Sequence, residues 1–281
     1  MKIVSDIETL RALLNEQRLQ GKKISFIPTM GALHQGHLSL VEIGKMHAEI
    51  SVMSIFINPT QFNNLLDLET YPRDFERDCE LARSVGVDFL FAPLTEHMYP
   101  DGLACKVLAG NRSQGLCGAT RPGHFDGVVT VVLKLFNIVE PDFAVFGDKD
   151  FQQVQVIEEM VDGLFLNLKI IHAPLLRDED GVALSSRNKR LSTEQRVVAR
   201  TIPEVLFDTK KKVSRGEVSS ESLIAEAIES LTASGLVVDY VEIRDSKTLE
   251  PQINVNEGAR MFIAVFASEV RLIDNCLLKG S

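Results

Sequence analysis

The feature that most constrains this fold is the alternation of short, continuously apolar segments with amphipathic ones through the first 175 residues. The segments ISFIPT and ISVMSIFINP have the length and β-branched character of strands, and HLSLVEIGKMHA between them has helical spacing. Further strand-type runs cover 87–93, 142–147 and 168–176, separated by helical stretches at Asp74–Gly86, Gly127–Val139 and Phe151–Val161. Strands that are apolar on both faces and alternate with helices are typical of a parallel sheet covered on both sides. We therefore predict a doubly wound α/β domain over residues 1–175.

The two ends of this region are also marked in the sequence. Ser5 and Glu8 have the spacing of a capping box ahead of a first helix that ends at Gly21.

Beyond about residue 176 the pattern changes to helices at Thr193–Val213 and Ser219–Ser234, followed by the strand-like runs VVDYVEIRD and RMFIAVFASEVRLID. Helices followed by strands predict a smaller α+β domain over residues 176–281.

Composition excludes several classes of protein. The chain has 30 Lys and Arg against 39 Asp and Glu, a net charge of −9, so it lacks the long-range attraction that nucleic-acid binders have for phosphate. We expect no membrane segment, because there is no apolar run of the required length, and we expect no N-terminal leader. The four cysteines form no CxxC pair, which favours a reducing, cytoplasmic location.

Polar, glycine-containing segments follow four of the predicted strands. They are PTMGALHQGH, NPTQF, GDKDFQQ and RDEDGVALSSRN. In an open parallel sheet, ligands bind beyond the carboxyl ends of the strands, so these four segments are expected to converge on one site.

The first segment nearly matches a phosphate-binding P-loop, with Gly31 and Gly36 at the required spacing. His37 and Leu38 replace the lysine and the hydroxyl residue that such a loop needs, so a P-loop NTPase is disfavoured. What remains is a glycine-permissive loop at a helix N-terminus with His34 and His37 one turn apart, a setting that favours an anion. The alternatives are a structural pair of surface histidines and a partial metal site.

The other segments offer further phosphate and hydroxyl ligands, each beside a plainer interpretation. Lys149 can supply a compact positive charge and Asp150 can accept hydrogen bonds, although the same stretch can be a surface turn that caps a helix. Arg187 in SSRN can bind phosphate with two N–H groups, or belong to a helix cap. Arg121 and His124 in RPGHFDG are further cation candidates, and Asp78 could face an amine or a hydrated metal ion at the sheet edge.

Taken together, these motifs resemble the pantoate–β-alanine ligase family over essentially the whole chain. His34-Gln35-Gly36-His37 resembles its HIGH-type nucleotidyl-transfer tetrad, and NPTQF, YPRD, RPGHFDGVVTVVLKLFN, GDKDFQQ, DGVALSSRN and RLIDN match in order. The resemblance implies a dimeric, Rossmann-like enzyme with a smaller C-terminal domain. It also implies that pantoate attacks the α-phosphate of ATP, with Mg²⁺, and that β-alanine then displaces AMP from pantoyl adenylate. We expect the C-terminal domain to act as a lid, because the adenylate must be kept from water.

The resemblance also implies roles for single residues. His37, His34, Lys149 and Arg187 are the expected catalytic residues, and Gln61 and Gln153 the pantoate contacts, with Gln61 also bordering β-alanine. Arg121 and Asp78 are second-rank candidates, and no direct protein ligand to the metal is otherwise expected. The expected ATP contacts are Met30, Gly31, Ala32, Leu33, His34, Gln35, Gly36, His37, Gly147, Asp148, Lys149, Asp150, Leu176, Leu184, Ser185, Ser186 and Arg187.

Two other functions remain open at this point. A cytidylyltransferase-type enzyme shares the HxGH arrangement but would retain the nucleotide in its product, and a non-catalytic sensor would bind ATP without turnover.

Phe151 and Leu184 depart from the residues common in the family, and neither change removes a charge.

Overall fold

The computed structural model describes residues 1–63 and 65–280, and its internal contacts divide the chain into two units. The first unit comprises Met1–Asp148 and Gln153–Pro174. The second unit comprises Lys149–Gln152 and Leu175–Ser281. The short segment Lys149–Gln152 therefore belongs to the second unit, although it follows a strand of the first.

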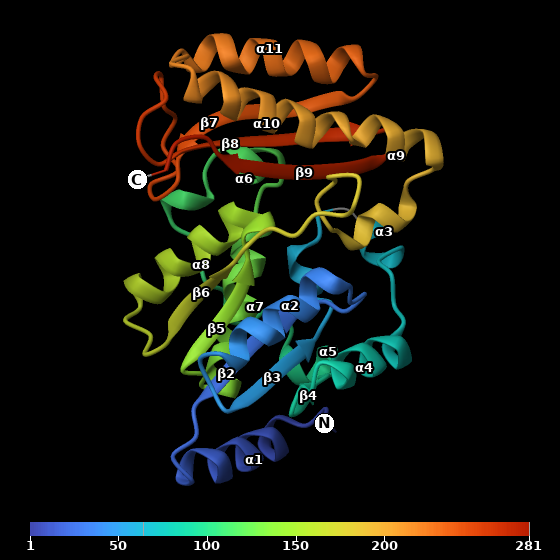
Figure 1. The fold of residues 1–281 in the computed structure, drawn as a ribbon. Coiled ribbons are helices and arrows are strands. Elements are labelled where there is room, and N and C mark those ends of the chain that lie inside the picture. The colour runs from blue at the N-terminus through green and yellow to red at the C-terminus, as the bar shows by residue number, and fades with distance from the viewer. Residues whose placement is uncertain (64, 281) are drawn as a thin grey trace. The chain divides into compact units, whose positions relative to one another are not determined.

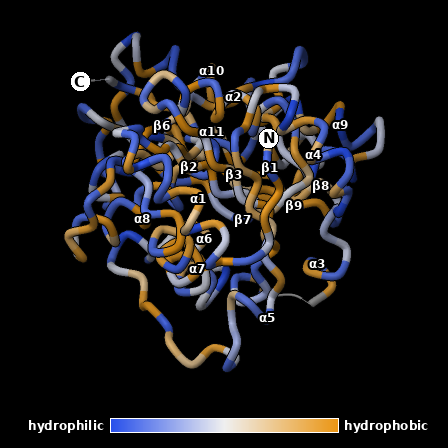
Figure 2. The backbone as a smooth tube through the Cα atoms, turned by 90° about the horizontal axis from the view of Figure 1, so that it is seen from below, coloured by the Kyte–Doolittle hydropathy of each residue, from blue (hydrophilic) through white to orange (hydrophobic). Residues whose placement is uncertain are grey.

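In the described part of the chain, six strands of the first unit form one sheet in which every pairing is parallel. The strands are β1 (Lys2–Val4), β2 (Ile24–Thr29), β3 (Ile50–Ile55), β4 (Phe89–Phe91), β5 (Phe143–Gly147) and β6 (Lys169–Ala173). Their order is β1-β4-β3-β2-β5-β6, and the predicted α/β class with a parallel sheet is confirmed. Figure 2 shows hydrophobic residues along β2 and β3, which lie in the interior of this sheet.

Helices cover both faces of the parallel sheet. Residues of α2 and α4 pack with Ile27 and Met53 on one face, while Phe136 of α7 meets Phe26 edge-on at 6.4 Å on the other. The longer helices of this unit are α1 (Ile7–Leu19), α2 (Gln35–Lys45), α4 (Phe75–Ser84), α7 (His124–Val139) and α8 (Phe151–Gly163), whose first two residues belong to the second unit. Shorter elements are η1 (Pro59–Gln61), α3 (Leu65–Glu69), α5 (Thr95–Met98), η2 (Asn111–Ser113), α6 (Leu116–Thr120) and η3 (Asp148–Asp150).

In the second unit, an antiparallel sheet is covered on one face by two helices (Figure 1). Its strands, in the described residues, are β7 (Val237–Asp245), β8 (Ala259–Ala267) and β9 (Val270–Leu277). Helices α10 (Thr201–Ser214) and α11 (Ser220–Ala233) pack on the face formed by Met261, Ile263 and Val265. Because side chains alternate along a strand, Arg260 and Phe262 lie on the opposite face, which we call the open face. The remaining elements are η4 (Ser186–Arg190) and α9 (Thr193–Ala199).

Several predicted boundaries were wrong, each for a local reason. The side chain that caps α1 is Asp6, which accepts from Thr9 N at 2.7 Å, rather than Ser5. The single helix predicted over 193–213 is two helices that meet at Arg200, because the ring of Pro203 cannot accommodate a helical carbonyl four residues before it. The run from 260 to 274 is likewise two strands, turned at Ser268 with φ +56°.

Among the described residues, no helix combines the length and the apolar character needed to cross a membrane. The four cysteines are all free thiols, of which Cys79 and Cys117 are buried and Cys105 is exposed.

Candidate functional site

The order of the strands places the predicted motifs at one edge of the parallel sheet. Strands β2 and β5 are neighbours, but the chain leaves β2 toward β3 on one side and leaves β5 toward β6 on the other. Such a switch point opens a crevice beyond the carboxyl ends of the two strands. The HQGH segment follows β2, NPTQF follows the adjacent β3, and Gly147-Asp148 ends β5. Lys149 and Asp150 continue directly from that end along the chain.

A buried carboxylate fixes the loop between β2 and α2. The two oxygens of Asp78 accept hydrogen bonds from Ala32 N at 2.8 Å and from Leu33 N at 2.7 Å. Asp78 is 3% exposed, and Ala32 holds a left-handed φ of +52°. At Gly31, φ +80°, a Cβ atom would come within 2.8 Å of the same carboxylate. The sequence suggested an amine or a hydrated metal ion as the partner of Asp78, and that role stays a prediction. In the structure both oxygens accept hydrogen bonds from backbone amides of the loop.

His34 and His37 lie together where α2 begins. His34 is the N-cap residue, and its Nδ1 accepts from Gly36 N at 3.1 Å. The neutral ring therefore carries its proton on Nε2, which makes Nε2 a donor. The ring of His37 lies against that of His34, with centroids 4.1 Å apart and ring planes tilted by 40°. Two imidazoles thus stand beside the first N–H groups of a helix, an arrangement suited to an anion.

A network of buried polar side chains orients Gln61. Asn58 is fully buried and donates from Nδ2 to Gln61 Oε1 at 3.0 Å and to Gly127 O at 3.1 Å. Tyr99 completes the network by donating from its hydroxyl to Asn58 Oδ1 at 2.8 Å, and burial raises the pKa of Tyr99. With its oxygen engaged by Asn58, the Gln61 amide presents Nε2 next to Met30 Sδ, 3.2 Å away. Asn58 and Tyr99 could not be identified as site residues from the sequence, because their roles depend on contacts that no local pattern encodes.

The cation candidates Arg121 and His124 bind this same segment from the other side. His124 Nδ1 lies 2.8 Å from the Gln61 carbonyl oxygen, and Arg121 donates to that oxygen from Nη2 at 3.3 Å. Arg121 Nη1 also lies 3.0 Å from His124 Nε2. The backbone of Gln61 is therefore fixed by His124, the first residue of α7, and by Arg121 at the end of α6, while its amide is fixed by Asn58.

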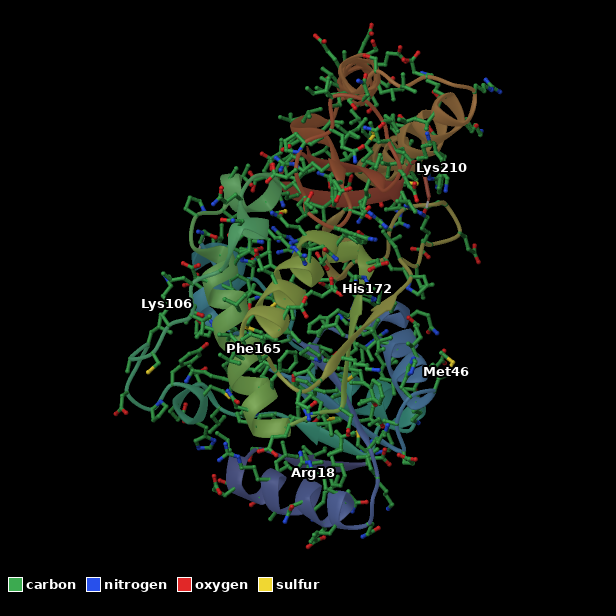
Figure 3. The ribbon with its side chains drawn as sticks, turned by 90° about the vertical axis from the view of Figure 1, so that its left-hand side faces the viewer. Arg18, Met46, Lys106, Phe165, His172 and Lys210 are labelled. Atoms are coloured by element: carbon green, nitrogen blue, oxygen red, sulfur yellow. The ribbon has the colours of Figure 1, made fainter. Side chains whose placement is uncertain are left out.

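An imidazolium clamps the end of β5. His172 of β6 lies beside helix α8 (Figure 3), with Nδ1 2.5 Å from Asp148 and Nε2 3.0 Å from Glu158. The hydrogen bonds with Asp148 and then with Glu158 outweigh the effect of burial and raise the pKa of His172 to about 9. Burial raises the pKa of Glu158, but the contacts with His172, the charge of Arg112 and the hydrogen bond from Gln155 together outweigh this and lower the pKa overall. His172 is therefore charged at neutral pH and ties the turn after β5 to α8.

Within the second unit, the residues from Leu176 to Arg187 form a short hairpin-like loop. Leu184 N donates to Leu176 O at 3.0 Å, and Arg177 and Ala183 form a bridge between the two sides. Ser185 caps η4 by accepting from Arg187 N at 3.3 Å, and Asn188 Nδ2 donates to Ala183 O at 2.9 Å. Lys149, in the same unit, has Nζ 3.5 Å from Asp150 Oδ1.

The parallel sheet thus gathers the residues at 30–37, Gln61 and Gly147-Asp148 at one edge, and Gln153 follows in the first turn of α8. The 176–187 loop and Lys149-Asp150 belong to the second unit. In the part of the chain that the structure describes, no three His, Cys, Asp or Glu side chains gather as a metal site.

Comparison with known proteins points to one family. A family model described as pantoate-beta-alanine ligase matches residues 2–277. The pantothenate synthetase of Trichlorobacter lovleyi is 46% identical over 279 residues, covering 99% of each chain. That of Pseudomonas putida is also 46% identical, covering 98% of this chain and 96% of the relative.

Two solved structures are similar over nearly the whole chain. The pantothenate synthetase of Thermus thermophilus has a TM-score of 0.94 at 41% identity, covering 99% of this chain and 100% of that one. A pantoate-beta-alanine ligase from Francisella tularensis, solved with beta-gamma ATP and beta-alanine, has a TM-score of 0.85 at 37% identity, covering 99% and 98%.

Proposed function

The chain belongs to the pantoate–β-alanine ligase family, and from that premise we propose how its residues divide the work of the reaction. It is an ATP-dependent ligase that joins pantoate to β-alanine and forms pantothenate. A carboxylate is a poor acyl donor to an amine because oxide is a poor leaving group. We propose that the pantoate carboxylate first attacks the α-phosphate of ATP, releasing pyrophosphate, and that the amine of β-alanine then displaces AMP from the mixed anhydride.

The loop and helix after β2 hold the nucleotide in this proposal. Residues 30–37 present backbone N–H groups and the start of α2 to the phosphates, which favours negative charge there. His37 and the Nε2 proton of His34 donate to phosphate oxygens that gain charge as the bond to pantoate forms. Because the hydrogen bonds from Asp78 fix the loop beforehand, these donors need little reorganisation when charge develops.

The turn after β5 and the 176–187 loop contribute the remaining ATP contacts. Gly147, Asp148 and Asp150 line the turn, and the ammonium of Lys149 and the guanidinium of Arg187 neutralise the phosphates. Mg²⁺ enters as part of the MgATP substrate, since this ion binds mainly through phosphates and its own waters. The remaining proposed contacts are those of Leu176, Leu184, Ser185 and Ser186.

Pantoate is held by two glutamines. Gln61 presents the N–H of its amide because Asn58 occupies the oxygen. Gln153, in the first turn of α8, offers a second amide. Gln61 also borders the place of β-alanine. Such fixed amides suit hydroxyl and carboxylate groups, whose lone pairs accept amide hydrogens.

At the level of the whole molecule, we propose that residues 1–175 bind ATP and pantoate and that residues 176–281 act as a lid that keeps water from the adenylate. We also propose a homodimer that works in the cytoplasm. The four free thiols support a reducing compartment.

The observation that carries this proposal is the Asp78-fixed loop that leads into His34 and His37 at the switch point. The test is exchange of labelled pyrophosphate into ATP, with and without pantoate, followed by addition of β-alanine. We expect pantoate-dependent exchange and then release of AMP with the amide. A product that retains the nucleotide would indicate a nucleotidyl transferase instead, and ATP binding without exchange would indicate a sensor.

A further inference from the structure

The segment Lys149–Gln152 packs against the open face of the antiparallel sheet, within the second unit. The guanidinium of Arg260 lies 3.9 Å from the centroid of the Phe151 ring, and the ring of Phe262 lies 6.0 Å from it. Phe151 is 6% and Phe262 4% exposed. The backbone that carries the proposed phosphate-binding lysine is thus held by residues of β8, more than 100 positions later in the chain.

One side chain on this face touches that lysine directly. Asn275 of β9 donates from Nδ2 to the backbone carbonyl oxygen of Lys149 at 3.1 Å. Its own Oδ1 accepts from Arg260 Nη1 at 2.5 Å, and Asn275 is 6% exposed. A flip of the amide would set an NH₂ group against the guanidinium and an oxygen against the carbonyl, so Arg260 dictates which end of Asn275 faces Lys149.

The backbone of Asn275 is fixed from the opposite face of the sheet. The Asp274 carboxylate accepts from Arg177 Nη1 at 2.6 Å and from Nη2 at 2.9 Å, and it also accepts from Asn275 N at 2.7 Å. Asp274 is 4% exposed, so this paired contact is shielded from water. Two adjacent residues of RLIDN therefore act on opposite faces of the sheet. Asp274 binds Arg177 on one face, and Asn275 binds the Lys149 carbonyl on the other.

We propose that Asn275, oriented by Arg260, is a positioning residue that sets the backbone of Lys149 and so aims its ammonium at the transferring phosphate. This inference rests on the phosphate role proposed above for Lys149. It assigns to the closing RLIDN motif a function in the adenylation step, although Asn275 touches neither substrate.

The test is a double-mutant cycle between Asn275→Leu and Lys149→Gln, read by single-turnover release of pyrophosphate. Leucine keeps the shape of asparagine without its donor. We expect N275L to lower the rate about 30-fold, the scale on which a misplaced reacting group acts, while the Kd of pantoate stays unchanged. In the K149Q background the same substitution should change the rate by less than about twofold, because its effect passes through Lys149.

A matched control on the same strand is Arg271→Leu. Arg271 binds Asp239 at 2.7 Å in the same sheet, so its loss perturbs the unit without involving Lys149. R271L should keep the wild-type rate under conditions where thermal denaturation shows the protein folded. If N275L does not fold, Asn275→Ser removes the reach to Lys149 with a smaller side chain and is put through the same cycle.

The outcomes separate the two proposals. A wild-type rate in K149Q would refute the proposed phosphate role of Lys149, and with it the basis of this inference. A slow K149Q beside a wild-type rate in N275L would overturn the role of Asn275 alone. An equal loss from N275L in both backgrounds would also overturn it, since the effect would then be independent of Lys149.

Discussion

Replacing Asp78 with asparagine tests whether the loop before α2 must be ordered in advance. The carboxylate of Asp78 accepts two backbone N–H groups, from Ala32 and Leu33, in a buried setting. Asparagine has one oxygen, so one of these amides would face an NH₂ group and lose its acceptor. Leaving a buried amide without an acceptor costs about 1–3 kcal/mol, and loss of the charge weakens the other bond as well. We take about 2–3 kcal/mol as the resulting penalty on the ordered loop.

Because each 1.4 kcal/mol is about a factor of ten, this penalty predicts a fall of about 30- to 150-fold in the rate of pyrophosphate release. The assay is single-turnover adenylation at saturating pantoate, at a temperature where circular dichroism shows both proteins folded. The KM for ATP should also rise, because the backbone donors of the loop form part of the proposed phosphate site.

Asp74→Asn is the matched control, since Asp74 caps the same helix by accepting from Arg77 N at 3.2 Å. Asparagine caps helices as well as aspartate does, so D74N should keep nearly full activity. A wild-type adenylation rate in D78N would refute the argument that Asp78 orders the loop, and an equal loss in D74N would show that α4, rather than the loop, was perturbed.

Three further predictions concern other parts of the site. His37→Ala should lower the rate of pyrophosphate release by about 10²-fold, as removal of one charge-stabilising donor does, and an unchanged rate would contradict its role. Asn58→Leu should raise the KM of pantoate about fivefold while the Kd of ATP stays near wild type, because loss of its hydrogen bond to Gln61, worth about 1 kcal/mol, frees the Gln61 amide to rotate; equal weakening of both ligands would count against it. The raised pKa of His172 means that its contribution to stability is complete below pH 6.5 and is lost as the pH rises through about 9. The pKa shift corresponds to roughly 3 kcal/mol of stability, which partial exposure of the ring to solvent reduces. Urea unfolding should therefore show His172→Gln less stable than the wild type by about 1–2 kcal/mol at pH 6.5. A difference in stability that does not shrink by pH 9.5 would be inconsistent with this.

The fold could be predicted from the sequence wherever hydrophobic period was a sufficient guide. The central strands are apolar on both faces and are bounded by turn residues, so β2, β3 and β5 follow from pattern alone. Strand β1 was missed because three residues at a sheet edge carry almost no periodic signal, and its pairing with β4 joins positions far apart in the chain. The cap of α1 was misplaced by one residue because Ser5 and Asp6 are both good capping types, and only the geometry chooses Asp6.

For the candidate site, the sequence located residues near strand ends but not the distant side chains that bind them. Residues that lie directly at strand ends, such as His34 and Gln61, could be located because the parallel topology brings strand ends together. Their partners could not be found this way. Asp78 reaches a loop 46 positions earlier, Tyr99 reaches Asn58 across 41 positions, and Asn275 reaches Lys149 across 126. Helical and strand periods fix which face a residue occupies, but they contain no information about which side chain from another element meets it there.

Electrostatics gives a reason for the identity of these partners. Asp78 bonds one of the segments proposed to hold the triphosphate, and Asp148 belongs to another. Two like unit charges about 8 Å apart in an effective dielectric of about 20 repel each other by roughly 2 kcal/mol, so unscreened carboxylates there would oppose the binding of phosphate. Each carboxylate is, however, engaged by groups that offset it: Asp78 by two backbone amides, and Asp148 by the protonated ring of His172. The two anions can therefore order the loops that are proposed to hold ATP without repelling it. Loss of a partner would act twice, since it would release the loop and expose the substrate to an uncompensated negative charge.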